Sequence, residues 1–314
     1  MVQATDITVG FITFGALTAP YLSSFIESLG AQTIGRCRIV AFDNTPEAEN
    51  PNADVLRAAG IAVRRSPEGN IGFSRAYNVL IKEAAANGSK YMLVINPDTL
   101  LNADVIEQLA IALDADDTLG SACPKLLRWD FKNHRRTDTI DSAGLGLRSG
   151  LRFIDIGQGE SDSAAFDTAQ CLGPSGAAGL FRISALAAVA EAGSYFDEHF
   201  PLYKEDCDVA YRLHLAGFGS RLVSRAVVYH DRTASGGSLW KRIMNRRQRS
   251  RSSRRSAFIG DHLLWIKFWK TIPVSGKAHV LLRACLRFAA ALVEPYTLSA
   301  YRDIVRLSKT LLRY

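Results

Sequence analysis

The stretch that decides the fold is YMLVINPDT, residues 91–99. Its first five residues, Tyr91–Ile95, are all apolar, which is typical of a buried strand. Asn96 and Pro97 then end the strand in a turn, and the carboxylate of Asp98 follows directly. The segment therefore predicts a buried strand with an acidic side chain at its carboxyl end.

The same arrangement occurs upstream, where a strand over Arg38–Phe42 ends at Asp43. Around these two strands, strand-like and helix-like patterns alternate. We expect further strands over Ile7–Phe14 and Ile61–Arg65, and helices over Pro20–Leu29, Ala53–Ala59, Ser74 to about Ala86, and from the cap Asn102 to about Leu113. Such alternation produces right-handed βαβ units, so we predict an α/β fold with a mostly parallel sheet covered by helices. Ligands of these sheets bind at the carboxyl ends of the strands, where Asp43 and Asp98 are placed.

The second half of the chain has a different composition and periodicity. Residues 127–172 are rich in Gly and Asp with weak periodicity, which indicates short strands and loops inserted in the sheet domain. Further along we predict a strand over Ala177–Ser184, helices over Ala185–Ala192 and from near Glu205 to Gly217, and short strands over Ser220–Val223 and Ala226–Tyr229 that end at His230.

Length and composition set the class of protein. The chain has 314 residues, 47% of them hydrophobic and 22% charged, which are globular values that exclude a mostly disordered chain. No apolar run reaches the 18 or so residues of a membrane span, and the N-terminus lacks the basic lead of a signal peptide. Five scattered cysteines without a CxxC pair argue against a disulfide framework or a zinc module. We therefore expect a reduced, cytoplasmic protein.

Charge is divided unevenly along the chain. From Arg232 to the end there are 18 Lys and Arg against 3 Asp and Glu, a net charge of +15. The first 231 residues hold the other 20 basic and 28 acidic residues, a net charge of −8. We predict an acidic catalytic domain over 1–235 and a basic helical extension over 236–314, with the boundary near Ser235–Ser238, and an anionic partner for the extension.

The candidate chemical groups each have an ordinary structural role as well. Aspartate after a strand is a common turn residue, and acidic residues such as Glu205 and Asp206 in a first helical turn complement the helix dipole. Taken together, however, the sheet can bring two strand-end aspartates, the acidic cluster at 205–208 and His230 to one edge, where the carboxylates would repel one another without a cation. A divalent metal ion is the natural neutraliser.

Six segments in order make the chain similar to a known family: VAFDNT, EGNIGFSRAYN, VINPDT, GPSGAAGLFR, FDEHFPLYKEDCDVAYRLHLAGF and AVVYHD. Over about residues 7–235 the chain resembles an inverting glycosyltransferase of family 2 with the GT-A fold. Within that family it resembles the rhamnosyltransferase-like branch of bacterial envelope polysaccharide synthesis. The resemblance implies a nucleotide-sugar half over about 1–126 and an acceptor half over about 127–235.

The resemblance also implies site residues. It assigns donor binding to Asp43, Asn70, Gly72, Asn78, Asn96 and Asp98, acceptor contacts to Gly176, Ala177, Asp141 and Glu160, metal binding to Asp98 and His230, and catalysis to Asp206 as general base with Glu205 beside it. Asn96 stands where the family's metal motif has its first carboxylate, which leaves fewer protein ligands for the metal. Asp208 points about 200° away from Asp206 along a helix, so we expect it to be structural.

The implied reaction follows physical requirements. Mg²⁺ or Mn²⁺ on the diphosphate would neutralise the leaving group, and a histidine ligand would favour Mn²⁺. A carboxylate would take the proton of the acceptor hydroxyl, and attack opposite the diphosphate would invert the anomeric centre. The motifs favour deoxythymidine-diphosphate-rhamnose as donor, with a uridine-diphosphate sugar (galactofuranosyl or hexosyl) as the alternative.

The basic extension predicts a third kind of partner. Residues 241–255 hold eight basic side chains and no acid, Trp265 and Phe268 flank Lys267, and His279, Arg283 and Arg287 recur every four residues. Basic helices with apolar partners are typical of a membrane interface. We therefore predict that residues 240–314 bind the anionic cytoplasmic face of a bacterial inner membrane, where a lipid-linked acceptor would lie.

The amphipathic pattern of the extension is also compatible with protein contacts. In that case its apolar faces would pack on the catalytic domain or on a second subunit of a homo-oligomer. Nucleic acid is disfavoured as a partner, because no reading motif accompanies the Arg/Ser run. The alternatives to an enzyme are a nucleotide-sugar-binding protein without chemistry and a nucleic-acid-associated protein.

Overall fold

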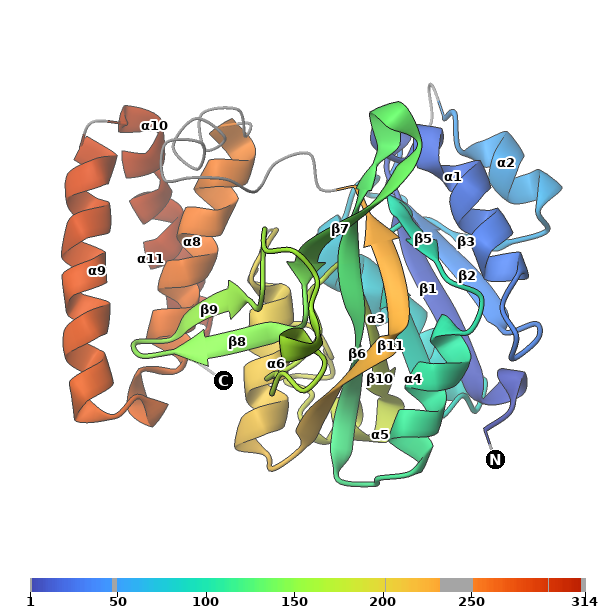
Figure 1. Ribbon diagram of the computed structural model, residues 1–314. Helices are drawn as coiled ribbons and strands as arrows, with labels where there is room; N and C mark the ends of the chain where they lie inside the picture. The colour runs from blue at the N-terminus through green and yellow to red at the C-terminus, as the bar shows by residue number, and fades with distance from the viewer. Residues whose placement is uncertain (1, 47–49, 201, 232–250, 293, 312–314) are drawn as a thin grey trace.

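The structure is a computed structural model that describes residues 2–46, 50–200, 202–231, 251–292 and 294–311. Its centre is a nine-stranded sheet with the order β3-β2-β1-β4-β10-β6-β11-β5, and β7 pairs with β6 beside this path. A separate two-stranded sheet is formed by β8 and β9. Helices flank the large sheet, and a group of C-terminal helices stands beside it (Figure 1).

The strands are β1 (Ile7–Thr13), β2 (Arg38–Asp43), β3 (Ala62–Arg64), β4 (Tyr91–Ile95), β5 (Thr99–Leu101), β6 (Leu119–Asp130), β7 (Arg135–Ser142), β8 (Leu145–Arg148), β9 (Arg152–Asp155), β10 (Ala178–Arg182) and β11 (Gly219–His230). The helices are α1 (Gly15–Gly30), α2 (Ala53–Ala58), α3 (Gly72–Ala86), α4 (Val105–Asp114), α5 (Ile183–Ala188), α6 (Glu205–Leu215), α8 (Arg251–Lys267), α9 (Val274–Leu292), α10 (Pro295–Leu298) and α11 (Ala300–Leu311).

The predicted α/β class with a mostly parallel sheet is confirmed. β3, β2, β1 and β4 pair in parallel, and β10 then pairs antiparallel with both β4 and β6. Because β10 is antiparallel to both β4 and β6, β6 runs in the same direction as β4. β11 is parallel to β6 and therefore also runs in this direction. The carboxyl ends of β2, β4, β6 and β11 therefore lie along one edge of the sheet.

Two hydrophobic cores cover the two faces of this sheet. One core joins α1, α2 and α4 to side chains such as Ile7, Val9 and Phe11 of β1. The other joins α3, α5 and α6 to Met92 and Val94 of β4 and to their neighbours. Burial on both faces explains the continuous apolar run of β4, since a strand with a solvated face would alternate.

Several boundaries differ from the sequence expectations. α1 begins at Gly15 and contains Pro20 inside it, because side chains satisfy the early N–H groups: Thr18 Oγ1 accepts from Phe14 and Thr45 Oγ1 from Gly15. Ser74 is a buried residue within α3 rather than its cap. The two short strands expected before His230 form one strand, β11, whose pairing with β6 shifts register between Val223 and Val227.

The C-terminal helices share a third core with the sheet domain. This core joins Phe153, Phe200 and Tyr211 of the sheet domain to residues of α8, α9 and α11, such as Leu264 and Ile304. The boundary predicted at Ser235–Ser238 and the run 241–250 lie outside the described residues. Where the chain is described, none of the helices has the length and apolarity needed to cross a bilayer.

The aromatic side chains of α8 are not placed as expected. The sequence predicts Trp265 and Phe268 at a membrane interface, but they are only 4% and 5% exposed. Phe268 meets the ring of Tyr211 on α6 edge-on at 4.8 Å, and α8 lies between α9 and α6 (Figure 1). The alternative that these faces pack on the catalytic domain therefore holds for α8.

Candidate active site

Asp98 and His230 meet at the carboxyl-terminal edge of the sheet. β5 and β11 pair so that His230 stands opposite Thr99, and the carbonyl of Asp98 accepts a hydrogen bond of 3.0 Å from the N–H of Asp231. This pairing brings Nε2 of His230 to 3.4 Å from Oδ2 of Asp98. Two residues far apart in the sequence thus form one polar pair, as the metal-binding prediction requires.

Asp141 holds the other side of the imidazole. Its Oδ2 lies 2.8 Å from Nδ1 of His230, and its side chain is fully buried. The acceptor contact of Asp141 stays a prediction; in this structure the carboxylate is buried against the imidazole. A carboxylate in this position can orient a histidine and fix its tautomer.

The electrostatics of this group fit a cation. Burial of the ring opposes its charged form, but the carboxylates of Asp98 and Asp141 outweigh burial and raise the pKa of His230 to about 10. The imidazolium thus supplies the positive charge that the two carboxylates demand. Oδ1 of Asp98 is buried with no hydrogen-bond partner in the described structure, which leaves an acceptor open for a metal ion.

The protein donors alone do not complete a metal shell. No group of three or more His, Cys, Asp or Glu side chains that could hold a metal occurs among the described residues. With the proton on Nε2 of His230 released, Asp98 Oδ1 and Oδ2 and this nitrogen would fit the oxygen-rich, partly nitrogen ligation of Mn²⁺, and the oxygens of a bound diphosphate would have to supply the rest.

Asp206 occupies the first turn of α6 beside the segment predicted to face the acceptor. Its Oδ2 accepts a hydrogen bond of 2.9 Å from the N–H of Gly176, and its Oδ1 accepts one of 2.7 Å from the N–H of Cys207. A Cβ placed on Gly176 would lie 3.5 Å from Asp206 Oδ2, so the backbone itself approaches the carboxylate closely. The structure thereby joins two predicted site residues from separate motifs.

The chain enters α6 through an unusual backbone turn. Tyr203 and Lys204 both have positive φ, of 66° and 78°. Non-glycine residues in this left-handed region carry strain, and consecutive ones are found where the surrounding structure holds them. The turn aims the first residues of α6, including Asp206, at the strand that follows Gly176.

Glu205 and Asp208 both point into the protein. The Glu205 side chain is 4% exposed, and burial, followed by the charge of Asp206, raises its pKa to about 8. A carboxyl so buried does not reach a sugar hydroxyl here, so any catalytic effect would act through Asp206. Asp208 is fully buried and bonds Arg212 Nε at 2.8 Å and Lys267 Nζ at 2.7 Å, which agrees with its predicted structural role.

Asp43 ends β2 in a dense set of donors. Its carboxylate accepts from Thr13, Thr45 and Asn50 and pairs with Nη2 of Arg65 at 2.6 Å. Burial alone would raise the pKa of Asp43, but these hydrogen bonds outweigh it and lower the pKa. Asn50 and Arg65 are site residues that sequence reasoning missed; an arginine at the end of the next strand, β3, was the available indication.

The remaining predicted donor-side residues, and Glu160 of the acceptor side, differ in their exposure and contacts. Asn70 is exposed, and its side-chain oxygen accepts from the N–H of Gly72, whose φ of 81° opens α3. Asn96 donates its N–H to the carbonyl of Ala177 at 2.9 Å, which ties the metal motif to the acceptor strand. Glu160 is exposed, with its backbone paired to Ile140.

Asn78 has a structural position. Its amide oxygen accepts from the N–H groups of Tyr195 and Phe196, and its amide nitrogen donates to Phe196 and Glu198. All four bonds are within the chain, so Asn78 fastens α3 to the loop that leads toward α6. The contact of Asn78 with the donor nucleotide stays a prediction; in this structure the hydrogen-bonding capacity of its side chain is used within the protein.

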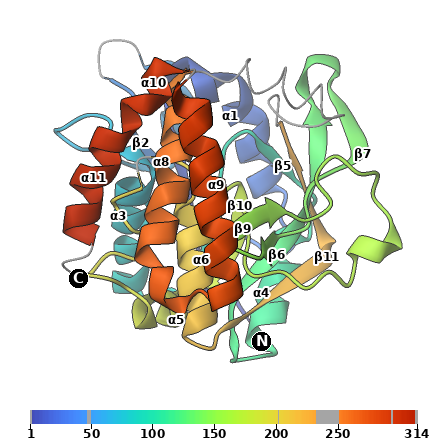
Figure 2. The same cartoon turned by 90° about the vertical axis from the view of Figure 1, so that its left-hand side faces the viewer.

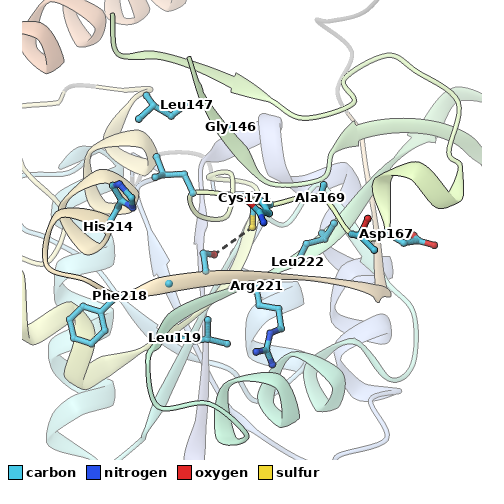
Figure 3. Close-up of a pocket in the computed structure, with 15 residues that line it drawn as sticks. Leu119, Gly146, Leu147, Asp167, Ala169, Cys171, His214, Phe218, Arg221 and Leu222 are labelled. Atoms are coloured by element: carbon cyan, nitrogen blue, oxygen red, sulfur yellow. Dashed lines mark hydrogen bonds between the residues drawn. The ribbon is translucent and has the colours of Figure 1, made fainter. Parts of the chain in front are cut away.

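A hollow elsewhere on the domain is separate from these groups. It has a volume of about 650 Å³ and lies over the amino-terminal ends of β6 and β11, between His214 and Phe218 on one side and Asp167 on the other (Figure 3). Asp98 and His230 follow the opposite, carboxyl ends of the strands. The hollow is therefore not part of the candidate active site.

Comparison with known proteins agrees with the fold. The model of glycosyl transferase family 2 matches residues 8–168, just over half of the 314-residue chain. Two observations define the class of protein: an α/β sheet with acidic groups at its carboxyl edge, and this family match. The class is that of transferases with a nucleotide-sugar-dependent fold. The chain belongs to glycosyl transferase family 2. No curated protein sequence matches it.

Three solved structures resemble it in fold. They are GalNAc-T7 with UDP, GalNAc and Mn²⁺ (12% identity, TM-score 0.52, covering 76% of this chain and 47% of that one), TarS of S. aureus (16%, 0.50, 95% and 54%) and the mannosyltransferase PcManGT from Pyrobaculum calidifontis in complex with GDP-Man and Mn²⁺ (14%, 0.50, 99% and 89%). The chain spans about half the length of the first two. At these identities the likeness concerns the GT-A fold alone.

Proposed function

We propose that this protein is a metal-dependent, inverting glycosyltransferase that moves a sugar from a nucleotide-diphosphate donor to a hydroxyl of a lipid-linked or polysaccharide acceptor. The observation that carries the proposal is the placement of Asp206. Its carboxylate is held by the N–H groups of Gly176 and Cys207 at the head of α6, beside the acceptor strand. Each oxygen keeps a lone pair beyond the one that accepts, so the group can still take a proton.

Asp98 and His230 would hold the metal ion. A bound Mg²⁺ or Mn²⁺ supplies Lewis-acid stabilisation of the departing nucleoside diphosphate. To serve as a ligand, His230 gives up the proton on Nε2, while Asp141 keeps the proton on Nδ1 in place at 2.8 Å. GalNAc-T7 and PcManGT are each described with Mn²⁺, which supports a divalent ion here.

Asp206 then acts on the acceptor. Its carboxylate takes the hydroxyl proton as that oxygen attacks the anomeric carbon, a role that contributes about 10²–10⁴-fold. A single displacement with the base on the acceptor side needs no protein nucleophile and inverts the configuration. Glu205, buried directly behind Asp206, tunes the base through its charge state and does not touch substrate.

The donor is proposed from the motifs. The segments VAFDNT and VINPDT favour deoxythymidine-diphosphate-rhamnose, with a uridine-diphosphate hexose or galactofuranose as the alternative. GalNAc-T7 is described with UDP and PcManGT with GDP-Man, so the fold accommodates several bases. In this structure Asn50 and Arg65 bind the carboxylate of Asp43. They are therefore the groups that a nucleobase would meet there.

The proposed location is the cytoplasmic face of a bacterial inner membrane. A lipid-linked acceptor would present its hydroxyl there, and the net charge of +15 after Asp231 would attract the anionic surface. Under this proposal the protein is peripheral and reaches the membrane through its C-terminal part.

The test is release of nucleoside diphosphate from a panel of nucleotide sugars. We expect release from one donor only, dependent on Mg²⁺ or Mn²⁺, abolished by EDTA, and accelerated by a lipid-linked acceptor. Product analysis by nuclear magnetic resonance would show an inverted anomeric centre. Nucleotide binding without release under any condition would favour the non-catalytic sugar-nucleotide-binding alternative, and no binding at all would overturn the proposal.

A further inference from the structure

The amphipathic helix α9 has its apolar side outward. Its exposed side carries large aliphatic and aromatic residues that are 49–84% exposed: Val274, Leu281, Leu282, Leu286, Phe288 and Leu292. At 100° per residue these positions fall on one side of the helix, and no charged residue lies among them. α9 is also the outermost of the C-terminal helices in Figure 1, where α8 lies between it and α6, and Figure 2 shows the molecule from the side on which α9 lies.

The basic residues of α9 face the protein. Arg283 Nη1 donates to the carbonyl of Gly150 at 3.1 Å, and its guanidinium lies 5.0 Å from the centre of the Trp265 ring. Arg287 pairs with Asp261 and lies over the rings of Phe258 and Trp265. The predicted membrane-facing stripe of His279, Arg283 and Arg287 is therefore wrong in direction: Arg283 and Arg287 bind α8 and β8–β9.

This reversal leaves a large apolar surface exposed. Isolated exposed apolar side chains are common, but a contiguous set of six on one helix marks an interaction site. α9 has 19 residues, so it is about 28 Å long and can present this side over its whole length. An apolar partner is required to cover this side of α9.

Charge decides between the two simplest partners. The described residues of the extension, 251–292 and 294–311, hold 11 Lys and Arg against 3 Asp and Glu, so two copies that met through this face would bring two basic groups of helices together. Of these acids, Asp261 pairs with Arg287, and Asp303 pairs with Arg255 and Arg306. Lys270, Arg302 and Lys309 are exposed cations of the same group of helices. An anionic bilayer is complementary to both the apolar side and these cations.

We propose that the outer side of α9 lies in the surface of an anionic lipid bilayer, parallel to the membrane, with the arginines of the same helix turned to the protein. The inference rests on the proposed membrane location and names the surface of the protein that would contact the lipid. It also reverses the orientation expected from the sequence: the aliphatic residues insert, whereas exposed cations such as those of α11 contact the head groups.

The test uses the full chain and vesicles. Flotation with phosphatidylcholine vesicles containing about 30% phosphatidylglycerol is compared with flotation on pure phosphatidylcholine. The variant Leu282→Gln/Leu286→Gln removes apolar surface without adding charge, and Ile111→Gln, a 52% exposed residue of α4, is the matched control. We expect the wild type and Ile111→Gln to bind the anionic vesicles equally, and the double variant to bind at least about tenfold more weakly.

Two outcomes would overturn the inference. One is equal vesicle binding by the double variant and the wild type. The other is a lipid-free wild-type dimer, seen by sedimentation, that the double variant converts to monomer, because the face would then join two copies. Melting curves check that the variants are folded. Nucleoside diphosphate release with a soluble acceptor, measured on the same samples, reports the proposed activity separately: its absence with vesicle binding intact counts against the enzyme and not against the membrane surface.

Discussion

Asp206 is held so that its carboxylate has one orientation. Two backbone N–H groups, from Gly176 and Cys207, each bind one oxygen, and the side chain is only half-buried. A base that is fixed by backbone groups loses little entropy when the acceptor hydroxyl arrives, which is the advantage of placing it on a helix terminus.

Asp206→Asn removes the proposed base and keeps the size of the side chain, although the amide nitrogen cannot accept one of the two N–H hydrogen bonds. We expect transfer to fall by about 10²–10⁴-fold, because the amide cannot take the proton, while donor affinity stays within about twofold. Turnover and donor binding, measured side by side by nucleotide release and calorimetry, check this. Near-normal turnover with intact donor binding would show that another group is the base.

Glu205 makes stability depend on pH. Its pKa is about 8 because burial, and then the charge of Asp206, disfavours the ionised form. The unfolded chain releases this proton near the ordinary pKa of about 4.3, so between that pH and about 8 the folded state binds more protons. The free energy of unfolding therefore falls as pH rises through this window.

Glu205→Gln cannot ionise and should lose this dependence. We expect the variant to gain stability over the wild type as pH rises from about 5 to about 8, by on the order of a few kcal/mol at the upper end, and the difference to stay level above that. Urea unfolding at several pH values is the measurement. Parallel pH profiles for both proteins would mean that Glu205 is not held neutral.

The sequence predicted the types of the candidate site residues and their order along the chain, but not the direction in which each side chain points. Asp98, Asp206 and His230 followed from strands and helices whose ends place them, and the structure puts Asp98 and His230 together. The partners of Asp141 and Asn78 were not predicted because they lie far along the chain: His230 is 89 residues from Asp141, and Phe196 is 118 residues from Asn78. A motif cannot show that such groups are already bonded.

At the scale of elements, Lys267 joins α8 to α6, the helix that carries the proposed base Asp206. Its Nζ lies 2.7 Å from Asp208 of α6, 2.7 Å from Asp197 and 2.5 Å from Glu191, and the side chain is 10% exposed. Burial would lower the pKa of Lys267, but Asp208 and Asp197 outweigh it and raise the pKa. The residue is a central support of α6.

Lys267→Met should destabilise the protein by about 3–5 kcal/mol, because it takes from Asp208 and Asp197 the cation that they share inside the fold. Lys270→Met, three residues further on at an exposed position, is the matched control and should change the free energy of unfolding by less than about 0.5 kcal/mol. Thermal and urea unfolding distinguish them. Equal losses for the two variants would show that the carboxylates are satisfied without Lys267.

The same contacts explain why helix patterns predicted the elements but not their orientation. The periodicity of α9 separates a basic side from an aliphatic side, and the usual rule buries the aliphatic one. Here the basic side is inward because Asp261, the Gly150 carbonyl and the ring of Trp265 receive its arginines. These partners belong to α8 and to the turn between β8 and β9, so helical period alone could not reveal them.

At the scale of the whole molecule, the C-terminal helices share a hydrophobic core with the sheet domain. Phe153, Phe200 and Tyr211 of the sheet domain are buried in one core with residues of α8, α9 and α11. A division of the chain into two independent units near residue 235, as charge alone suggests, would expose these side chains and leave Asp208 without Lys267.

A chain that ends at Asp231 should therefore be poorly soluble or molten, and inactive even toward a soluble acceptor. Loss of the shared core would free α6, and the Asp206 carboxylate would no longer be held against Gly176, since the support behind the helix is gone. Melting curves and nucleotide release from the truncated and full-length chains test this. A truncated chain with a sharp transition near that of the full chain and with full activity on a soluble acceptor would make the helices an independent appendage. Loss of both would show that the part of the molecule proposed to meet the membrane also holds the base in position.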